Sequence, residues 1–71
     1  MSAESSSAVL LHADHEGLHF TIETEGPDVG GYFLWAKRDD GSDIDELFED
    51  TVDRCKTLAL EKFGVPLNSW R

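Results

Sequence analysis

The fold is decided by residues 42–71, which read SDIDELFEDTVDRCKTLALEKFGVPLNSWR. Apolar residues recur there at steps of three and four, which predicts one amphipathic helix with a buried stripe. The stripe comprises Ile44, Leu47, Phe48, Val52, Cys55, Ala59 and Phe63. Ser42 or Asp43 is the predicted N-cap, and Glu46 would complete a capping box with Asp43. Gly64, followed closely by a proline, predicts the end of the helix.

Three predicted strands precede this helix. Residues 8–13, AVLLHA, form a short apolar run. Residues 18–25, LHFTIETE, alternate between apolar and polar, as in a half-buried antiparallel strand. Residues 31–37, GYFLWAK, are apolar on both faces. The predicted fold class is α+β: a three-stranded antiparallel meander (β-β-β-α) with one C-terminal helix packed on one face.

Turns and domain bounds follow from the residues between these strands. Gly17 predicts a turn with positive φ after the first strand, and residues 26–28, GPD, predict a second turn. Residues 1–7 are small and polar and are predicted to be a disordered N-terminal tail. The remainder, residues 8–71, is predicted to form a single domain.

Composition and charge limit the classes of function. The 71 residues include 6 basic and 15 acidic side chains, for a formal net charge of −9. Such a surface repels nucleic acid and anionic lipid, and it favours a basic protein partner. A single cysteine and the lack of an apolar N-terminal run or spanning segment predict a cytoplasmic protein with no membrane association.

The third predicted strand suggests an interface. In a three-stranded meander it lies at an edge, and one helix leaves Phe33 and Trp35 on the uncovered side of the sheet. Exposed aromatic pairs mark contact surfaces, with a second copy or another protein. The alternative is that Leu67 and Trp70 fold back over these rings. The glycine pair 30–31 before the strand predicts a bulge or a close backbone approach.

The histidines and the single cysteine are the other side chains that could carry chemistry. His12, His15 and His19 lie near the first turn and are the candidate metal ligands, although their spacing matches no metal motif. Cys55 lies on the helix stripe and is predicted to be a buried apolar thiol rather than a nucleophile. No cofactor is predicted, there are no candidate catalytic residues, and the chain is predicted not to be an enzyme.

The second half of the chain, residues 31–71, resembles a pattern in many small uncharacterised bacterial proteins. That pattern joins a Gly-aromatic-Leu strand to an acidic loop, a helix and an FGV…Trp ending. The matching positions are Gly31, Tyr32, Phe33, Leu34, residues 39–41, Phe48, Ala59, Phe63, Gly64, Val65 and Trp70. Some of these proteins are similar to toxin-neutralising immunity proteins, which are small, acidic and cytoplasmic. The resemblance implies a protein-binding role and transfers no functional residue.

The sequence thus predicts a non-enzymatic protein–protein interaction module, immunity-like in character, that binds a basic partner. The predicted interface comprises Tyr32, Phe33, Trp35, Asp39, Asp40, Asp43, Asp45, Glu46, Glu49 and Asp50. One alternative is a homodimer with a structural or regulatory role and no basic partner. Another is a metal- or ligand-binding domain that uses the three histidines.

Overall fold

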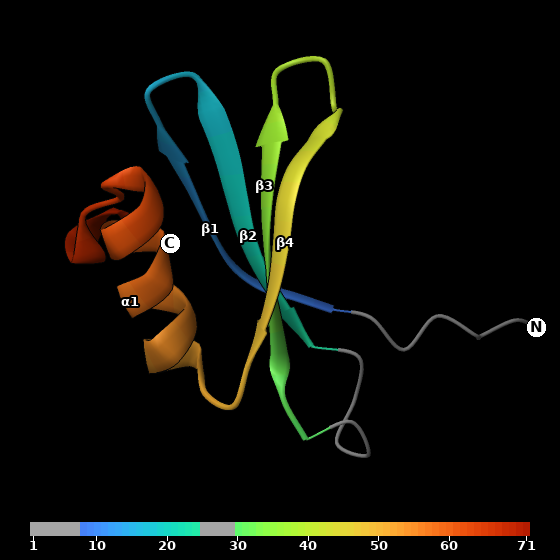
Figure 1. Ribbon diagram of the computed structural model, residues 1–71, viewed down its shortest axis with the longest axis vertical. Coiled ribbons are helices and arrows are strands. Elements are labelled where there is room, and N and C mark those ends of the chain that lie inside the picture. Colours follow the sequence, from blue (N-terminus) through green and yellow to red (C-terminus); the bar gives the residue numbers. More distant parts are fainter. Residues whose placement is uncertain (1–7, 25–29) are drawn as a thin grey trace, which may run out of the picture.

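The computed structural model describes residues 8–24 and 30–71, and Figure 1 shows a twisted antiparallel sheet with one helix packed beside it. The strands lie in chain order, β1-β2-β3-β4. The elements are β1 (Ala8–His15), β2 (Leu18–Thr24), β3 (Tyr32–Arg38), β4 (Asp43–Glu49), α1 (Val52–Phe63) and the short 3-10 helix η1 (Leu67–Ser69). The predicted tail, residues 1–7, and the predicted turn at residues 26–28 lie outside the described residues.

The α+β class and the C-terminal helix are confirmed, but the sheet has four strands where the sequence predicted three. The additional strand is β4, which the helical spacing had assigned to the helix. A tight turn makes the β3–β4 hairpin: Gly41 has φ 88°, and the Arg38 amide donates to the Ser42 carbonyl over 2.9 Å. Because β4 pairs with β3, β3 lies inside the sheet, and its apolar residues have a neighbouring strand on each side.

The N-cap of the helix therefore lies nine residues after Ser42 and eight after Asp43, the two caps that the sequence predicted. Thr51 is the N-cap, and its side-chain oxygen accepts from the Arg54 amide over 3.1 Å. Gly64 ends the helix with φ 77°, as predicted, and its amide donates to the Leu60 carbonyl over 2.9 Å. The predicted stripe is correct from Val52 onward, whereas Ile44, Leu47 and Phe48 belong to β4.

The core lies between α1 and the inner face of the sheet. The buried residues are Ala13, Phe20, Ile22, Leu34, Ala36, Cys55, Ala59 and Val65. Phe20 and Phe63 stack at an angle, with 5.2 Å between their ring centroids. Burial of a side chain such as Phe20 contributes roughly 1.5–3 kcal/mol, so a core this small depends on each of its large members.

The C-terminal residues return to the sheet at β1. The amide and carbonyl of Arg71 exchange hydrogen bonds of 2.9 and 3.0 Å with the carbonyl and amide of His12. Trp70 packs against the core, while Leu67 stays 54% exposed. The C-terminal segment thus covers part of the outer edge of β1. Within residues 8–24 and 30–71, neither helix has the length and apolar character needed to cross a bilayer.

The helix start can be tested by replacing the observed cap, Thr51, and one residue that the sequence predicted as the cap, Ser42. We expect Thr51→Ala to lower the free energy of unfolding by about 1 kcal/mol, because the Arg54 amide loses its acceptor. Ser42→Ala is the matched control and should change it by no more than about 0.5 kcal/mol, since Ser42 lies in an exposed turn. Urea unfolding followed by circular dichroism measures both. A larger loss for Ser42→Ala would contradict this helix start.

Candidate protein-interaction surface

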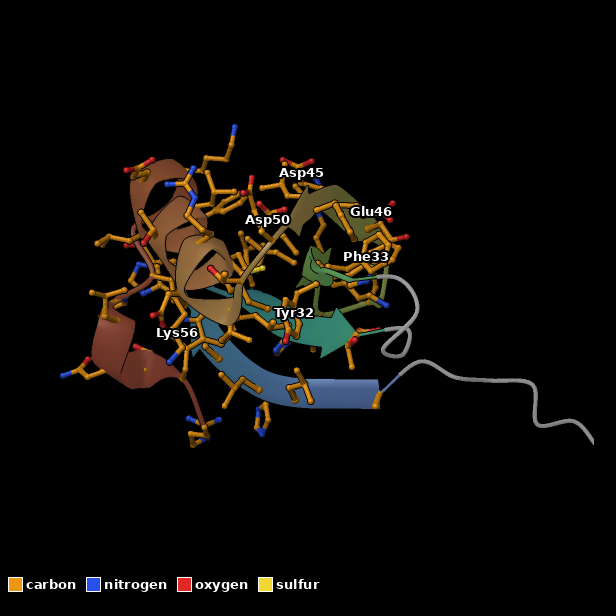
Figure 2. All side chains as sticks on the ribbon, turned by 90° about the horizontal axis from the view of Figure 1, so that it is seen from below. Tyr32, Phe33, Asp45, Glu46, Asp50 and Lys56 are labelled. Carbon is orange, nitrogen blue, oxygen red and sulfur yellow. The ribbon has the colours of Figure 1, made fainter. Side chains whose placement is uncertain are left out.

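In the described part of the chain, residues 8–24 and 30–71, no helix covers the face of the sheet opposite α1, and we call it the open face. Side chains alternate along each strand, so the register identifies those that point away from the core. Thr21, Trp35 and Glu46 form one row across β2, β3 and β4. Phe33 and Phe48 are paired in the next row. Figure 2 shows Phe33 and Glu46 on the side of the sheet away from α1.

An aromatic cluster of Phe33, Trp35 and Phe48 occupies the centre and one end of the open face. The rings of Phe33 and Phe48 are tilted, with 4.8 Å between their centroids, and Phe48 is 47% exposed. The Lys37 ammonium lies 5.5 Å from the centroid of the Trp35 ring. Trp70 packs on the core and Arg71 lies beside β1, so the alternative in which Leu67 and Trp70 cover these rings is wrong.

Gly31 supports the Phe48 ring. A Cβ atom built on Gly31 would overlap Cζ of Phe48, so the ring lies directly on the glycine backbone. The close backbone approach predicted from the glycine pair is therefore present at Gly31, where the approaching group is an aromatic ring. The helical spacing assigned Phe48 to the apolar stripe of the helix. Gly31, which is distant in the sequence, was the signal that a group packs closely against the start of β3.

Two parts of the predicted interface lie elsewhere. Tyr32 lies on the helix side of β3, packs against the core, and its carbonyl accepts from the Cys55 thiol over 3.9 Å. Figure 2 shows Tyr32 and Phe33 on opposite sides of the sheet. The predicted acidic residues from Asp43 to Glu49 lie on an edge strand, not on a helix.

Seven carboxylates line the β3–β4 turn, β4 and the residue after it; we call them the acidic edge. They are Asp39, Asp40, Asp43, Asp45, Glu46, Glu49 and Asp50. Three of them meet cationic side chains. Asp43 lies 3.7 Å from the Lys37 ammonium, Glu49 lies 3.6 Å from Nε of Arg54, and Asp39 lies 2.6 Å from Nε2 of His19. Within the described residues, the carboxylates of Glu46 and Asp50 form no ion pair. The edge therefore keeps a strong negative potential beside the aromatic cluster.

Backbone amides hold two further members of the acidic edge in place. Asp40 accepts from the Ser42 amide over 2.9 Å, and hydrogen bonds from Ser42 hold the pKa of Asp40 below its usual value. Asp45 accepts from the Glu46 amide over 2.8 Å. These local bonds fix the carboxylates near the backbone without neutralising their charge.

A charged clamp crosses the turn end of the open face. Nδ1 of His19 lies 2.6 Å from a carboxylate oxygen of Asp14, and Nε2 lies 2.6 Å from one of Asp39. Only the protonated imidazole can donate from both ring nitrogens. The clamp thereby joins β1 and β2 to the β3–β4 turn. Asp39 is 20 residues from His19, and no sequence signal links them.

The clamp shifts the pKa values of His19 and Asp14 in opposite directions. Hydrogen bonds to Asp14 and then Asp39 raise the pKa of His19, and the bond from His19 lowers the pKa of Asp14. Histidine has an ordinary pKa of about 6.5, so the contribution of His19 to stability is complete below about pH 6.5. It is lost as the pH rises through the raised pKa of the folded state. The Asp14 contribution is complete above about pH 4 and is lost as pH falls.

The three histidines do not converge. His12 and His19 lie on the open face, whereas His15 pairs with Leu18 on the other face and its Nε2 lies near Gly64. The described residues contain no group of three side chains arranged to hold a metal ion. Cys55 is buried, and burial together with the charge of Glu49 raises its pKa to about 11, so its thiolate is scarce at neutral pH.

The surface is the open face of the sheet with a border of charged residues. No pocket was found in the part of the chain that the structure describes. Comparison of the chain with protein-family models, curated proteins and solved structures found no match in any of the three.

The contact between Gly31 and Phe48 gives a stability prediction. Gly31 does not have positive φ, so an alanine there is opposed by the Phe48 ring alone. We expect Gly31→Ala to cost about 1–3 kcal/mol in the free energy of unfolding, which is typical of overpacking. In a Phe48→Ala background the same change should cost no more than about 0.5 kcal/mol. Equal losses in both backgrounds, measured by urea unfolding, would contradict the contact.

The His19 clamp gives a pH prediction. We expect the wild-type protein to lose stability between pH 6 and pH 8.5 because His19 deprotonates and one of its two donors is lost. His19→Gln should remove this part of the pH dependence, whereas His12→Gln, a histidine on the same face outside the clamp, should retain it. Urea midpoints at both pH values measure the effect. A wild-type pH dependence that persists unchanged in His19→Gln would count against the clamp.

Proposed function

We propose that the chain is a non-enzymatic protein-interaction module that binds a basic partner through the open face and the acidic edge. The observation that supports this most is the position of Phe48. It presents a half-exposed ring on the open face, and it belongs to β4, a strand rich in carboxylates. Aromatic anchors supply binding energy, and a surrounding charge speeds encounter with an oppositely charged partner.

Charge gives the proposal its direction. The net charge of −9 and the seven carboxylates of the acidic edge would attract a surface rich in lysine and arginine. The rings would then be desolvated against apolar side chains of that partner. The resemblance to small, acidic immunity proteins is in keeping with such a role. We also propose a cytoplasmic location for the chain, with which its single cysteine is in keeping.

A homodimer is the alternative, with the aromatic cluster buried between two copies. It is disfavoured by charge, because joining the open faces of two copies brings their acidic edges together. Like charges placed opposite one another across an interface cost several kcal/mol. The three histidines lie on different faces, so the geometry gives less support to the ligand-binding alternative.

In-cell photo-crosslinking tests the proposal. A benzophenone amino acid in place of Phe48 should crosslink to a partner of basic isoelectric point, identified by mass spectrometry. The control is the same amino acid at Leu67, a similarly exposed apolar position on the C-terminal segment. Adding Glu46→Lys to the position-48 variant should lower the yield at least several-fold, since the acidic edge loses charge.

Each outcome decides the proposal. A basic protein captured from position 48 and not from position 67 supports it. Crosslinks only between copies of the chain would replace it with the homodimer. Equal capture from both positions, or capture that does not depend on Glu46, would contradict recognition by this surface.

A further inference from the structure

The two edges of the sheet differ in what covers them. The outer edge of β1 carries Arg71, which pairs with His12, and an irregularity that leaves Leu10 without a partner on β2. Within residues 8–24 and 30–71, β4 pairs with β3 alone. Its register with β3 is regular from Asp45 to Glu49, after an irregularity at Ile44. Such an edge directs backbone donors and acceptors away from the sheet.

The register identifies the backbone groups that point outward from β4. In antiparallel sheets, residues of one strand alternately direct their backbone groups to the two sides. His12 bonds outward to Arg71, so its partner Thr21 must bond toward β3. By the same alternation, Trp35 bonds toward β2, and its partner Glu46 directs its amide and carbonyl away from the sheet. Phe48, two residues on, does the same.

The bond between Asp45 and Glu46 agrees with this direction. The Glu46 amide donates over 2.8 Å to the Asp45 side chain, as expected for an amide outside the β3–β4 ladder. The carboxylate of Asp45 thus occupies the place that the carbonyl of an added strand would take. An incoming strand would release Asp45, and that carboxylate could then pair with a basic side chain.

We propose that an extended, basic segment of a partner protein adds as an antiparallel fifth strand beside β4. This rests on the proposed function and specifies how the partner is held. Main-chain bonds to Glu46 and Phe48 would supply the pairing, and alternate side chains would supply the specificity. The lysines and arginines of the segment would face the acidic edge, and one apolar side chain would join the aromatic cluster.

The register fixes the order of side chains in such a segment. Read from its N-terminus, the residues opposite Glu49, Phe48, Leu47, Glu46 and Asp45 should be basic, apolar, apolar, basic and basic. The residues opposite Phe48 and Glu46 lie on the open face. The residue opposite Leu47 lies on the inner face, where Leu47 packs against the core.

A second copy of β4 does not fit this pattern. Antiparallel pairing of two β4 strands about Leu47 would set Asp45 of each copy opposite Glu49 of the other. Pairing about Glu46 would set the two Glu46 side chains face to face. Like charges directly opposite on a sheet are destabilising, so the acidic edge selects against its own copy and for a basic strand.

Synthetic peptides test the proposal on the intact chain. The probe is lysine-isoleucine-valine-arginine-lysine with a threonine and a neutral cap at each end. One N-methylated version blocks the amides of isoleucine and arginine, opposite Phe48 and Glu46. The matched control blocks the amides of valine and the second lysine, which would point away from β4. A third peptide replaces the basic residues with glutamate.

The readouts are dissociation constants and the amide shifts of the ¹⁵N-labelled protein. We expect the first N-methylated peptide to bind about tenfold or more weakly than its control, because two ladder bonds are lost. The glutamate peptide should show no binding, and the Glu46 and Phe48 amides should shift most with the probe. Glu46→Lys, at an exposed position, should weaken probe binding several-fold without unfolding the protein.

Other results would overturn the inference. Equal affinity of the two N-methylated peptides would exclude strand addition while leaving recognition by the open face intact. Shifts centred on His12 would place the strand at β1. Shifts of the Glu46 amide with protein concentration alone would make a second copy the occupant. Absence of probe binding would also reject the inference, and capture from position 48 would then still decide the proposed function separately.

Discussion

The pairing of β3 with β4 is the constraint on which the rest of the structure depends. β3 is apolar on both faces, so it needs a strand on each side and a cover for its inner face. β4 supplies the missing strand, and α1 can then lie across the inner face. The same pairing brings Phe48 against Phe33 and places a run of carboxylates at the edge. Core, open face and acidic edge all follow from this hairpin.

The sequence was sufficient where the signal is local. Alternation over residues 18–25 predicted a half-buried strand, and Phe20 and Ile22 on its apolar face are buried in β2. Gly17 and Gly64 take the positive φ that their turn and helix end require. It failed at β4 because Ile44, Leu47 and Phe48 also fit helical spacing, and acidic residues also suit the start of a helix. What decided between them was non-local, namely the need of β3 for a second neighbour.

The candidate site also contains residues that could be predicted from local sequence and residues that could not. Phe33 and Trp35 could be assigned to an uncovered face from their alternation with Leu34 alone. The third ring, Phe48, came from a residue assigned to the core, and Tyr32 moved to the helix side because it shares the face of Leu34. The clamp between His19 and Asp39 was not predictable, since nothing local relates a strand residue to a turn residue that follows the next strand.

The buried thiol of Cys55 is a built-in probe of local opening of the fold. Alkylation needs both exposure and a thiolate, and the folded chain withholds both, because Cys55 lies between α1 and the sheet with its pKa raised to about 11. The rate at which an added reagent modifies it therefore reports how often the helix separates from the sheet. With one cysteine in the sequence, that rate belongs to a single event at a known place.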